Sequence, residues 1–282
     1  MDKFRTLFIK FTSSDSIKLD GILLGNNKKT CVIYVHGMNG NFYKSNIPFE
    51  LSKQNKFSVF SINTRGHDLI STIRTKTGKK SILAGTGAEV FEDSIKDIKG
   101  SINAIKKLGF KNIFLAGHST GCQKITYYLY KTIDKRIKGI ILFAPADDYS
   151  IKKQELGKNF YAYQKTIKKL LKIEKLPLKE YNFFTPKRLK SAYTLNGNEA
   201  KIYNYNGNLK EFSSIKIPIF VIFGSKEQYK DRDVSEYMNI LKIKTKSKYF
   251  CYKIIKNANH SFYNYEKELT KNVKNYILKI GK

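Results

Sequence analysis

The stretch Ile113-Phe114-Leu115-Ala116-Gly117-His118-Ser119-Thr120-Gly121 decides the fold of this chain. A short apolar run ends at Gly-His-Ser-Thr-Gly, and an amphipathic segment follows it directly. This pattern is typical of a sharp turn from a strand into a helix, in which the serine hydroxyl points outward. Only hydrogen-sized side chains at Gly117 and Gly121 leave room for the serine backbone in such a turn. The pattern therefore predicts that Ser119 is presented between a buried strand and a helix.

Strand and helix patterns alternate along the rest of the chain. Apolar runs and period-two alternation predict strands at residues 4–11, 16–24, 30–35, 57–63, 112–116, 137–144, 217–224 and 248–255. Apolar residues spaced three and four apart predict helices at residues 44–54, 89–108, 120–133, 233–241 and 262–280. The first two strands form an antiparallel hairpin, and the later alternation implies a mostly parallel, eight-stranded sheet with helices on both faces. We expect residues 69–88, which lack a clear period, to form a long surface loop.

Residues 146–215 interrupt this alternation. The segment is rich in Lys and Tyr, has helical spacing of apolar residues around Ile167, and is broken by prolines. We expect it to form a helical cap inserted over the strand ends, while residues 1–145 and 216–282 form the α/β core. Its aromatic side chains have two alternative roles, because they either line a pocket for an aromatic or acyl group or pack the cap onto its own domain. These aromatic residues are Phe160, Tyr161, Tyr163, Tyr181, Phe183, Phe184 and Tyr193.

The formal charge of +30 raises the question of nucleic-acid binding. Nearly all the positive charge comes from Lys, and Lys is enriched together with Asn, Ile and Tyr, which indicates genome composition rather than selection for phosphate contacts. Arg, the residue favoured for bidentate recognition of phosphates and bases, is not enriched. The lysines are also spread along the chain instead of forming one block. We therefore expect nonspecific attraction to anionic surfaces but no specific nucleic-acid partner.

The sequence carries no pattern for a membrane span, a secretion signal or a metal site. No run of about 18 uncharged apolar residues occurs, and Met1–Thr6 lacks the basic-then-apolar layout of a signal peptide. Cys31, Cys122 and Cys251 are widely spaced and form no C-x-x-C pair, which argues against a disulfide framework or a zinc site. We expect buried, reduced thiols in a cytoplasmic protein. Nothing in the sequence indicates an oligomeric state.

Polar motifs follow several of the expected strands. Because sites in open parallel sheets form beyond the carboxyl ends of the strands, we expect these motifs to gather at one edge of the sheet. The motifs are His36-Gly37, Arg65-Gly66-His67-Asp68, Ser119, Asp147-Asp148, Glu227 and His260. For the Arg-Gly-His-Asp motif, we expect a structural role in bracing loops beside the site rather than a contact with a ligand.

On these motifs the chain resembles the α/β-hydrolase superfamily over essentially its whole length. The resemblance is carried by His36-Gly37, Asn63–Asp68, Gly117–Gly121 and Asn259-His260-Ser261. Together with Pro145–Tyr149, these motifs are similar to a serine esterase branch that includes siderophore-ester hydrolases. Cinnamoyl-ester hydrolases and S33-type serine peptidases are relatives outside that branch. The resemblance implies an α/β-hydrolase fold with a helical cap and a nucleophile elbow at the serine.

The resemblance also implies a catalytic triad with Ser119 as nucleophile and with partners in the chain order serine, acid, histidine. His260 is the one histidine after Ser119, and it falls in the loop where the family carries its base. The family places the acid three residues past the glycine that ends the seventh strand, which is Glu227 here, although Asp is the usual residue. The alternative acids are Asp231, Asp233, Asp147 and Asp148.

Two backbone N–H groups are expected to stabilise the oxyanion formed during attack. They belong to Thr120, directly after the nucleophile, and to Met38, directly after His36-Gly37. The implied function is a serine hydrolase that cleaves a carboxylic ester of a small or medium-sized molecule through an acyl-enzyme, with no metal or organic cofactor. A peptidase or acyltransferase with the same triad, and a non-catalytic scaffold of the same fold, are the alternatives.

Overall fold

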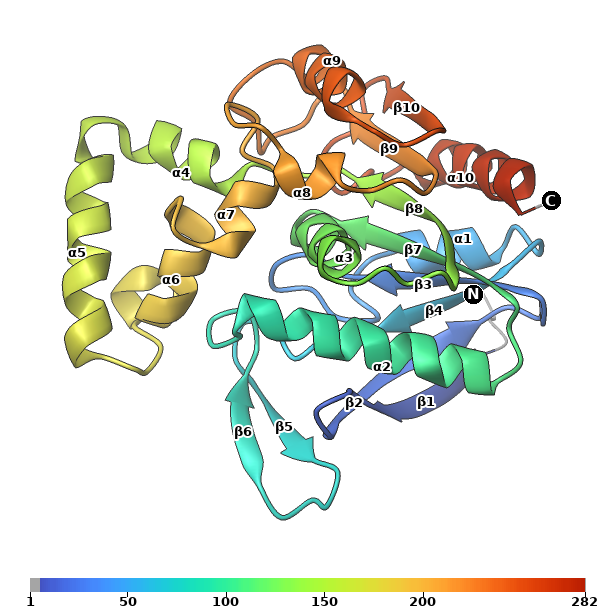
Figure 1. Cartoon of the computed structure of the whole chain (residues 1–282), viewed down its shortest axis with the longest axis horizontal. Coiled ribbons are helices and arrows are strands. Elements are labelled where there is room, and N and C mark those ends of the chain that lie inside the picture. The colour runs from blue at the N-terminus through green and yellow to red at the C-terminus, as the bar shows by residue number, and fades with distance from the viewer. Residues whose placement is uncertain (1–5, 282) are drawn as a thin grey trace.

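A ten-stranded sheet runs through the centre of the computed structural model, which describes residues 6–281 (Figure 1). The strands follow the order β10-β9-β8-β7-β3-β4-β2-β5-β6, and β1 pairs with β2. They are β1 (Thr6–Thr12), β2 (Ile17–Leu24), β3 (Thr30–Val35), β4 (Ser58–Ile62), β5 (Ser71–Thr75), β6 (Ser81–Ala84), β7 (Asn112–His118), β8 (Ile137–Phe143), β9 (Ile219–Gly224) and β10 (Phe250–Ile255). The pairs from β10 to β4 are parallel, and the pairs that involve β1, β2, β5 and β6 are antiparallel. The predicted α/β class with a mostly parallel sheet is therefore confirmed.

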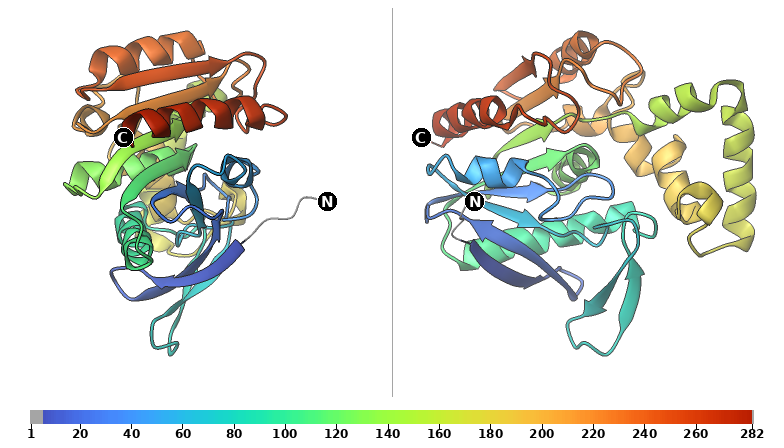
Figure 2. Two further views of the ribbon diagram at one scale, coloured as in Figure 1. Left: turned by 90° about the vertical axis from the view of Figure 1, so that its right-hand side faces the viewer. Right: turned by 180° about the vertical axis from the view of Figure 1, so that it is seen from behind.

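Helices cover both faces of this sheet (Figure 2). α2 (Ser94–Lys107) and α3 (Thr120–Lys131) pack on one face, and α1 (Ile47–Ser52) and α10 (Glu266–Ile280) pack on the other. α9 (Val234–Lys244) packs beside β10. Because the central strands are covered on both sides, every residue of β3, β4 and β9 is buried, which explains their continuous apolar runs.

The sheet contains two strands more than predicted. Residues 69–88, which we expected to form a loop, contain β5 and β6, and these strands form an antiparallel hairpin that extends the sheet beyond β2. Each of the two strands has a single buried residue, Ile73 in β5 and Ala84 in β6. Neither strand therefore has the apolar period from which a strand is predicted. Backbone pairing and a turn with Gly78 at a φ of 74° define the hairpin instead.

The ends of the chain differ from the predicted boundaries. The last helix begins at Glu266 rather than at residue 262, because Phe262 and Asn264 have φ angles of 56° and 66°, which an α-helix cannot include. The stretch before the helix is therefore a loop, and it carries His260. At the other end, the predicted first strand begins at residue 4, and that residue, like most of Met1–Thr6, lies outside the described part of the chain.

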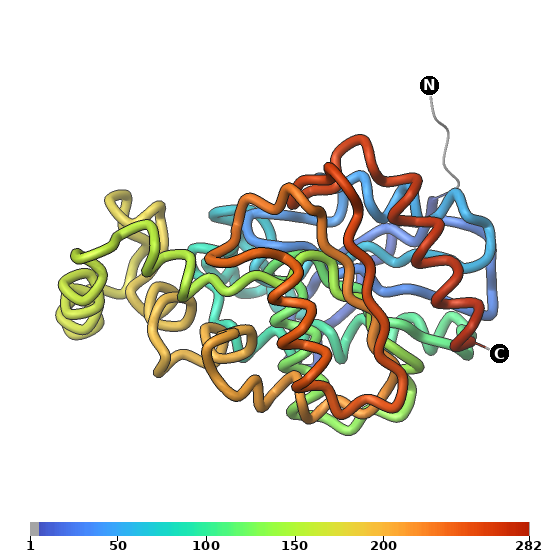
Figure 3. Tube along the Cα trace, turned by 90° about the horizontal axis from the view of Figure 1, so that it is seen from above, coloured from blue at the N-terminus to red at the C-terminus, as the bar shows by residue number. Residues whose placement is uncertain are grey.

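Five helices of residues 146–215 connect β8 to β9: α4 (Asp148–Leu156), α5 (Phe160–Ile173), α6 (Pro186–Tyr193), α7 (Asn198–Ile202) and α8 (Lys210–Ser213). In this segment α5 stands farthest from the sheet (Figures 1 and 3). Ile167, Phe184 and Leu189 form a small apolar cluster in its outer part. Tyr203 and Phe212, near its end, belong to the main core of the protein. The segment therefore projects from the sheet at α5 and is anchored to the core at α7 and α8.

Two of the three cysteines are buried, as expected from the sequence, and the third is not fully buried. The three cysteines are free, and Cys31 and Cys122 are buried, whereas Cys251 is only half-buried. Burial raises the pKa of the Cys122 thiol well above its usual value. None of the helices in residues 6–281 is long and apolar enough to cross a membrane.

Candidate active site

Ser119 lies at a strained turn between β7 and α3. Its φ of 52° and ψ of −123° lie outside the regions that residues with a side chain normally adopt. A Cβ atom added to Gly117 would lie 2.5 Å from the Gly121 backbone, and a Cβ atom added to Gly121 would lie 2.2 Å from the Val35 carbonyl oxygen. The Ser119 N–H donates to the Phe143 carbonyl at 2.9 Å, which ties the turn to β8. The predicted steric role of the two glycines is therefore confirmed.

His260 and Glu227 form a buried pair on two neighbouring loops. Glu227 follows β9, and His260 follows β10, the strand that pairs with β9. His260 Nδ1 lies 2.8 Å from Glu227 Oε1 and 2.9 Å from Oε2. Because an ionised carboxylate can only accept, this contact places the proton of a neutral imidazole on Nδ1 and leaves the lone pair on Nε2.

Further contacts hold these two loops together. Gly224, at the end of β9, approaches the second loop so closely that an added Cβ atom would lie 2.2 Å from the Ala258 carbonyl oxygen. The His260 N–H donates to Gln228 Oε1 at 2.8 Å, and the Tyr229 N–H donates to Glu227 Oε1 at 2.9 Å. The carboxylate and the imidazole are thus oriented by backbone contacts as well as by each other.

The two candidate acids that follow Glu227 in the chain have other partners. Asp231 accepts a hydrogen bond from the Tyr237 hydroxyl at 2.6 Å and pairs with Arg232 at 2.9 Å. Asp233 precedes α9, and its side chain is 79% exposed. Neither carboxylate hydrogen-bonds to His260 in the described structure.

The two candidate acids that follow β8 also have other partners. Asp147 caps α4 by accepting from the Ser150 N–H at 2.9 Å, and burial raises its pKa to about 6. Asp148 accepts from Gln123 Nε2 at 3.0 Å. Burial, together with the nearby negative charge of Glu199, raises the pKa of Asp148 to about 8. Of the five candidate carboxylates in residues 6–281, Glu227 is the one that the structure brings to His260.

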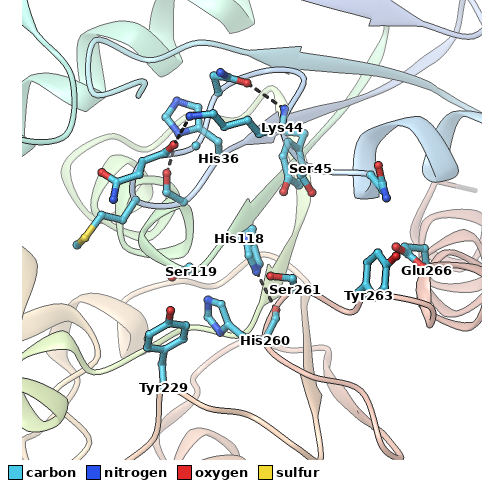
Figure 4. Close-up of a pocket in the computed structure, with 18 of the residues that line it drawn as sticks. His36, Lys44, Ser45, His118, Ser119, Tyr229, His260, Ser261, Tyr263 and Glu266 are labelled. Carbon is cyan, nitrogen blue, oxygen red and sulfur yellow. Dashed lines mark hydrogen bonds between the residues drawn. The ribbon is translucent and has the colours of Figure 1, made fainter. Parts of the chain in front are cut away.

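Ser119 and His260 open onto the same cavity, which has a volume of about 460 Å³ (Figure 4). Met38 and Asp148 also line it, and most of the other lining side chains are polar. These polar lining residues include Asn39, Asn41, Lys44, Ser45, Asn46, Tyr263 and Glu266. The Ser119 hydroxyl makes no hydrogen bond to any residue between 6 and 281, so it is free to meet a ligand in the cavity.

Two backbone N–H groups in the segments that adjoin Ser119 have no backbone acceptor in the described chain. Thr120 begins α3, so its N–H has no acceptor within the helix. Met38 lies in the loop that follows β3 (residues 36–41, the β3 loop), and a Cβ atom added to Gly37 of this loop would lie 3.0 Å from Ser119 Cβ. Neither the Met38 N–H nor the Thr120 N–H donates to a backbone carbonyl of residues 6–281. Both are therefore available to an oxygen atom beside Ser119.

His36 fixes the orientation of the Gly37–Met38 peptide. Its Nε2 accepts from the Thr64 N–H at 3.2 Å, so the ring proton is on Nδ1, which donates to the Gly37 carbonyl at 2.8 Å. Burial and the nearby charge of Lys124 lower the pKa of His36 to about 3 and keep the ring neutral. In a trans peptide the N–H points opposite to the carbonyl, so this bond also directs the Met38 N–H away from His36.

The sequence matches the family described as "alpha/beta hydrolase fold" over residues 30–179, which is more than half of the 282-residue chain. The chain belongs to the α/β-hydrolase fold family. No curated protein sequence matches this α/β-hydrolase fold protein. The match agrees with the sheet order, the strained serine after β7 and the histidine after the last strand.

Solved structures similar to this α/β-hydrolase fold protein include two proteins named as esterases and the protein Est1E. The esterase Pf2001 of Pyrococcus furiosus has 20% identity and a TM-score of 0.63, with 98% of this chain and 92% of that chain covered. Est1E of Butyrivibrio proteoclasticus, solved with ferulic acid bound, has 17% identity and a TM-score of 0.68, with 96% and 98% covered. The carboxylesterase CesB of Bacillus subtilis has 17% identity and a TM-score of 0.56, with 100% and 93% covered. At these identities, the similarity establishes the fold alone.

The aromatic residues of the inserted segment pack together instead of lining the cavity. None of the seven aromatic side chains considered from the sequence is among the cavity-lining residues of the described chain. Phe184 is buried in the small cluster of the segment, and Tyr163, Tyr181 and Tyr193 pack against that cluster. The structure therefore supports the packing role for five of these residues, whereas the other two, Tyr161 and Phe183, are exposed. Met38 of the β3 loop packs against the same cluster.

Several buried polar residues near the site were missed by the sequence interpretation. Thr64, Thr86, Lys124 and Arg188 are all buried and hydrogen-bonded around the β3 loop of this α/β-hydrolase fold protein. No short motif connects them, because they come from four separate segments of the chain. In residues 6–281, no group of three or more His, Cys, Asp or Glu side chains could hold a metal ion.

Proposed function

We propose that the protein is a serine hydrolase that cleaves a carboxylic ester of a small or medium-sized molecule. The observation that carries the proposal is the geometry around one cavity. His260, which is paired with the buried Glu227, opens onto it together with the strained Ser119, and the N–H groups of Met38 and Thr120 have no backbone acceptor in the described chain. A serine hydroxyl is a poor nucleophile at neutral pH unless a base removes its proton during attack.

In the proposed reaction, Ser119 Oγ attacks the ester carbonyl while its proton passes to His260 Nε2. Glu227 holds the imidazole by Nδ1 and stabilises the imidazolium that forms. The N–H groups of Met38 and Thr120 donate to the oxyanion of the tetrahedral intermediate. When the intermediate collapses, His260 gives the proton to the departing alkoxide, and an acyl-enzyme remains. Water then attacks the acyl-enzyme while His260 takes a proton from it. His260 returns this proton to Ser119 Oγ as the carboxylic acid leaves.

The similar structures and the size of the cavity support an ester substrate. Pf2001 is named as an esterase and CesB as a carboxylesterase, and Est1E was solved with ferulic acid, a small aromatic acid. The cavity volume of about 460 Å³ lies within the range of small-molecule sites. We further propose that residues 146–215 act as a cap beside this cavity, since Asp148 of α4 lines it.

Replacement of the serine tests the proposal. We expect Ser119→Ala to lower kcat on p-nitrophenyl acetate and butyrate by at least about 10³-fold, because the nucleophile is lost. Ser261→Ala is the matched control, because Ser261 lines the same cavity and has no role in the proposed reaction. Turnover by Ser119→Ala at the wild-type rate would overturn the proposal.

Two further measurements separate the related activities. A fluorophosphonate probe should label the wild type and not Ser119→Ala, whereas a non-catalytic scaffold would remain unlabelled in both. Product analysis with an added amine or alcohol shows whether water or another acceptor resolves the acyl-enzyme. For an ester hydrolase, we expect the free acid to be the main product both with and without the added amine or alcohol.

A further inference from the structure

Four charged side chains meet in the interior where the inserted segment joins the core. Lys124 of α3 lies 2.8 Å from Glu89, which precedes α2. Arg188 of α6 pairs with Glu199 of α7, and its Nη2 lies 3.7 Å from Glu89 Oε1. All four residues are buried, and Arg188 is 0% exposed. Two cations are thus balanced by two anions, and we call these four residues the buried ion cluster.

One connection runs from Arg188 to the β3 loop through Thr86. Arg188 Nε donates to the Thr86 carbonyl at 2.9 Å. The Thr86 hydroxyl accepts from the Asn39 N–H at 2.9 Å and donates to the Gly66 carbonyl at 2.9 Å. The Asn39 N–H belongs to the peptide that follows Met38. Thr86 therefore restrains the peptide that follows Met38.

A second connection runs from Lys124 to the same loop through His36. Lys124 Nζ donates to Thr64 Oγ1 at 3.2 Å, and Thr64 Oγ1 lies 3.1 Å from His36 Nε2. His36 in turn donates from Nδ1 to the Gly37 carbonyl. The peptide that precedes Met38 is therefore also connected to the buried ion cluster. In addition, the Met38 side chain packs against the Ile167–Phe184–Leu189 cluster of the inserted segment.

These contacts bear on catalysis because an oxyanion hole must be aligned before the reaction. A donor aligned in advance stabilises the oxyanion without a reorganisation cost, and a misplaced donor loses that effect. The buried charges also resist separation, since removal of one partner leaves another charge unpaired in the interior. The α6–α7 end of the inserted segment is therefore joined to the core through buried charges.

We propose that the inserted segment positions the oxyanion donor of Met38, with Arg188 and Thr86 as positioning residues. The proposal rests on the proposed function, because it assigns the β3 loop a role in stabilising the oxyanion. Arg188 and Thr86 touch neither substrate nor reacting atoms. They act through the peptide groups around Met38, so their loss should weaken binding of the transition state more than binding of the substrate.

Thr86→Val tests the proposal, because valine keeps the shape of threonine and removes the hydroxyl. We expect kcat on p-nitrophenyl butyrate to fall by about 10- to 100-fold while KM changes by less than about threefold. The affinity of a trifluoromethyl ketone inhibitor, which forms an oxyanion on the serine, should fall by the same factor as kcat/KM. Thr86→Ser, which restores the hydroxyl, should recover most of the lost rate.

Thr126→Val is the matched control. Thr126 is also a buried threonine whose hydroxyl is bonded, in this case to the Tyr203 hydroxyl at 2.7 Å, and its hydroxyl makes no hydrogen bond to the β3 loop in residues 6–281. We expect its kcat and inhibitor affinity to match those of the wild type. Arg188→Lys is the second variant, because it keeps the positive charge and removes the Nε donor to Thr86. It should lower kcat in the same way as Thr86→Val, with an intact far-ultraviolet circular dichroism spectrum.

Two results would overturn the inference, and both can be told apart from failure of the proposed function. If Thr86→Val and Arg188→Lys keep wild-type kcat and inhibitor affinity while Ser119→Ala is inactive, the positioning role is wrong and the hydrolase proposal stands. If Thr126→Val loses as much kcat as Thr86→Val, the loss reflects general destabilisation, and the positioning role is again wrong. Full activity of Ser119→Ala would instead reject the proposed function itself.

Discussion

Two buried arginines of this protein form ion pairs of the same kind in different places. Arg65 Nη2 lies 2.7 Å from Asp97 of α2 and 2.9 Å from Asp15, between β1 and β2. Arg188 pairs with Glu199 and donates to a backbone carbonyl that adjoins the β3 loop. The side chain of Asp15 is 28% exposed, whereas the cluster around Arg188 is closed to solvent.

The difference between the two arginines shows that similar ion pairs contribute to different properties. The partners of Arg65 join the first hairpin to α2, and none of them lines the cavity within the described residues. This arrangement supports the structural role predicted for Arg65 from the sequence. The hydrogen bonds of Arg188, in contrast, lead to the peptide groups around Met38. We therefore expect substitutions at Arg65 to change stability and substitutions at Arg188 to change the rate as well.

Among the substitutions that test this comparison of Arg65 with Arg188, Arg65→Met should have the largest effect. The substitution leaves the fully buried Asp97 carboxylate without its cation, so the free energy of unfolding should fall by about 3–5 kcal/mol. In the fraction that remains folded, kcat should stay within about twofold of the wild type. Urea unfolding and active-site titration with a fluorophosphonate measure the two quantities separately. A large loss of kcat per active site in Arg65→Met would remove the distinction between the two arginines.

A smaller effect concerns the pH dependence of stability. Burial alone would raise the pKa of Asp15, but hydrogen bonds from Arg65 and Ser13 outweigh it and lower the pKa to about 2, against a usual value of 3.8. Between about pH 4 and pH 2 the unfolded chain therefore binds a proton at Asp15 that the folded chain does not. The contribution of the ionised Asp15 to the free energy of unfolding is fully present above about pH 4 and is lost as the pH falls through 2. Since Asp15 is partly exposed, we expect the loss to be on the order of 1 kcal/mol.

Urea unfolding at several pH values between 5 and 2 measures this effect. Asp15→Asn, which cannot titrate, should show a shallower loss of stability toward acid pH than the wild type. If the free energy of unfolding falls equally steeply with pH in both proteins, the lowered pKa of Asp15 is contradicted. The ion pair of Asp15 with Arg65 would then contribute no more than an ordinary surface ion pair.

The candidate site and the buried ion cluster differ in how well they could be predicted from the sequence. Ser119 lies in a short motif, and the family resemblance points to His260 and Glu227 by their chain order after recognisable strands, so each could be named as a candidate before the structure. The buried ion cluster could not be predicted, because Glu89, Lys124, Arg188 and Glu199 are far apart in a chain with 53 Lys and Arg residues and 23 Asp and Glu residues. A buried lysine and an exposed lysine look the same in such a sequence.

Strands that are buried could be predicted from their apolar side chains, and exposed strands at the edge of the sheet could not. β3, β7, β8 and β9 are buried on both faces, and their continuous apolar runs indicate strands directly. β5 and β6 are largely exposed, so their pairing depends on backbone hydrogen bonds that leave no mark in side-chain pattern. Likewise, the last helix was predicted to begin at residue 262 rather than at Glu266, because the spacing of apolar residues does not reveal the positive φ angles at Phe262 and Asn264.

The most direct test of the catalytic assignment is kcat of Glu227→Gln on p-nitrophenyl butyrate beside that of Asp231→Asn. Both substitutions replace a carboxylate with an amide in the loop after β9, and in the structure only Glu227 of this pair bonds His260. We expect Glu227→Gln to lower kcat by about 10³- to 10⁴-fold, because the amide no longer holds the imidazole in its reactive tautomer. We expect Asp231→Asn to stay within about threefold of the wild type. Wild-type kcat in Glu227→Gln, or an equal loss in Asp231→Asn, would contradict the assignment of Glu227 as the acid that orients His260.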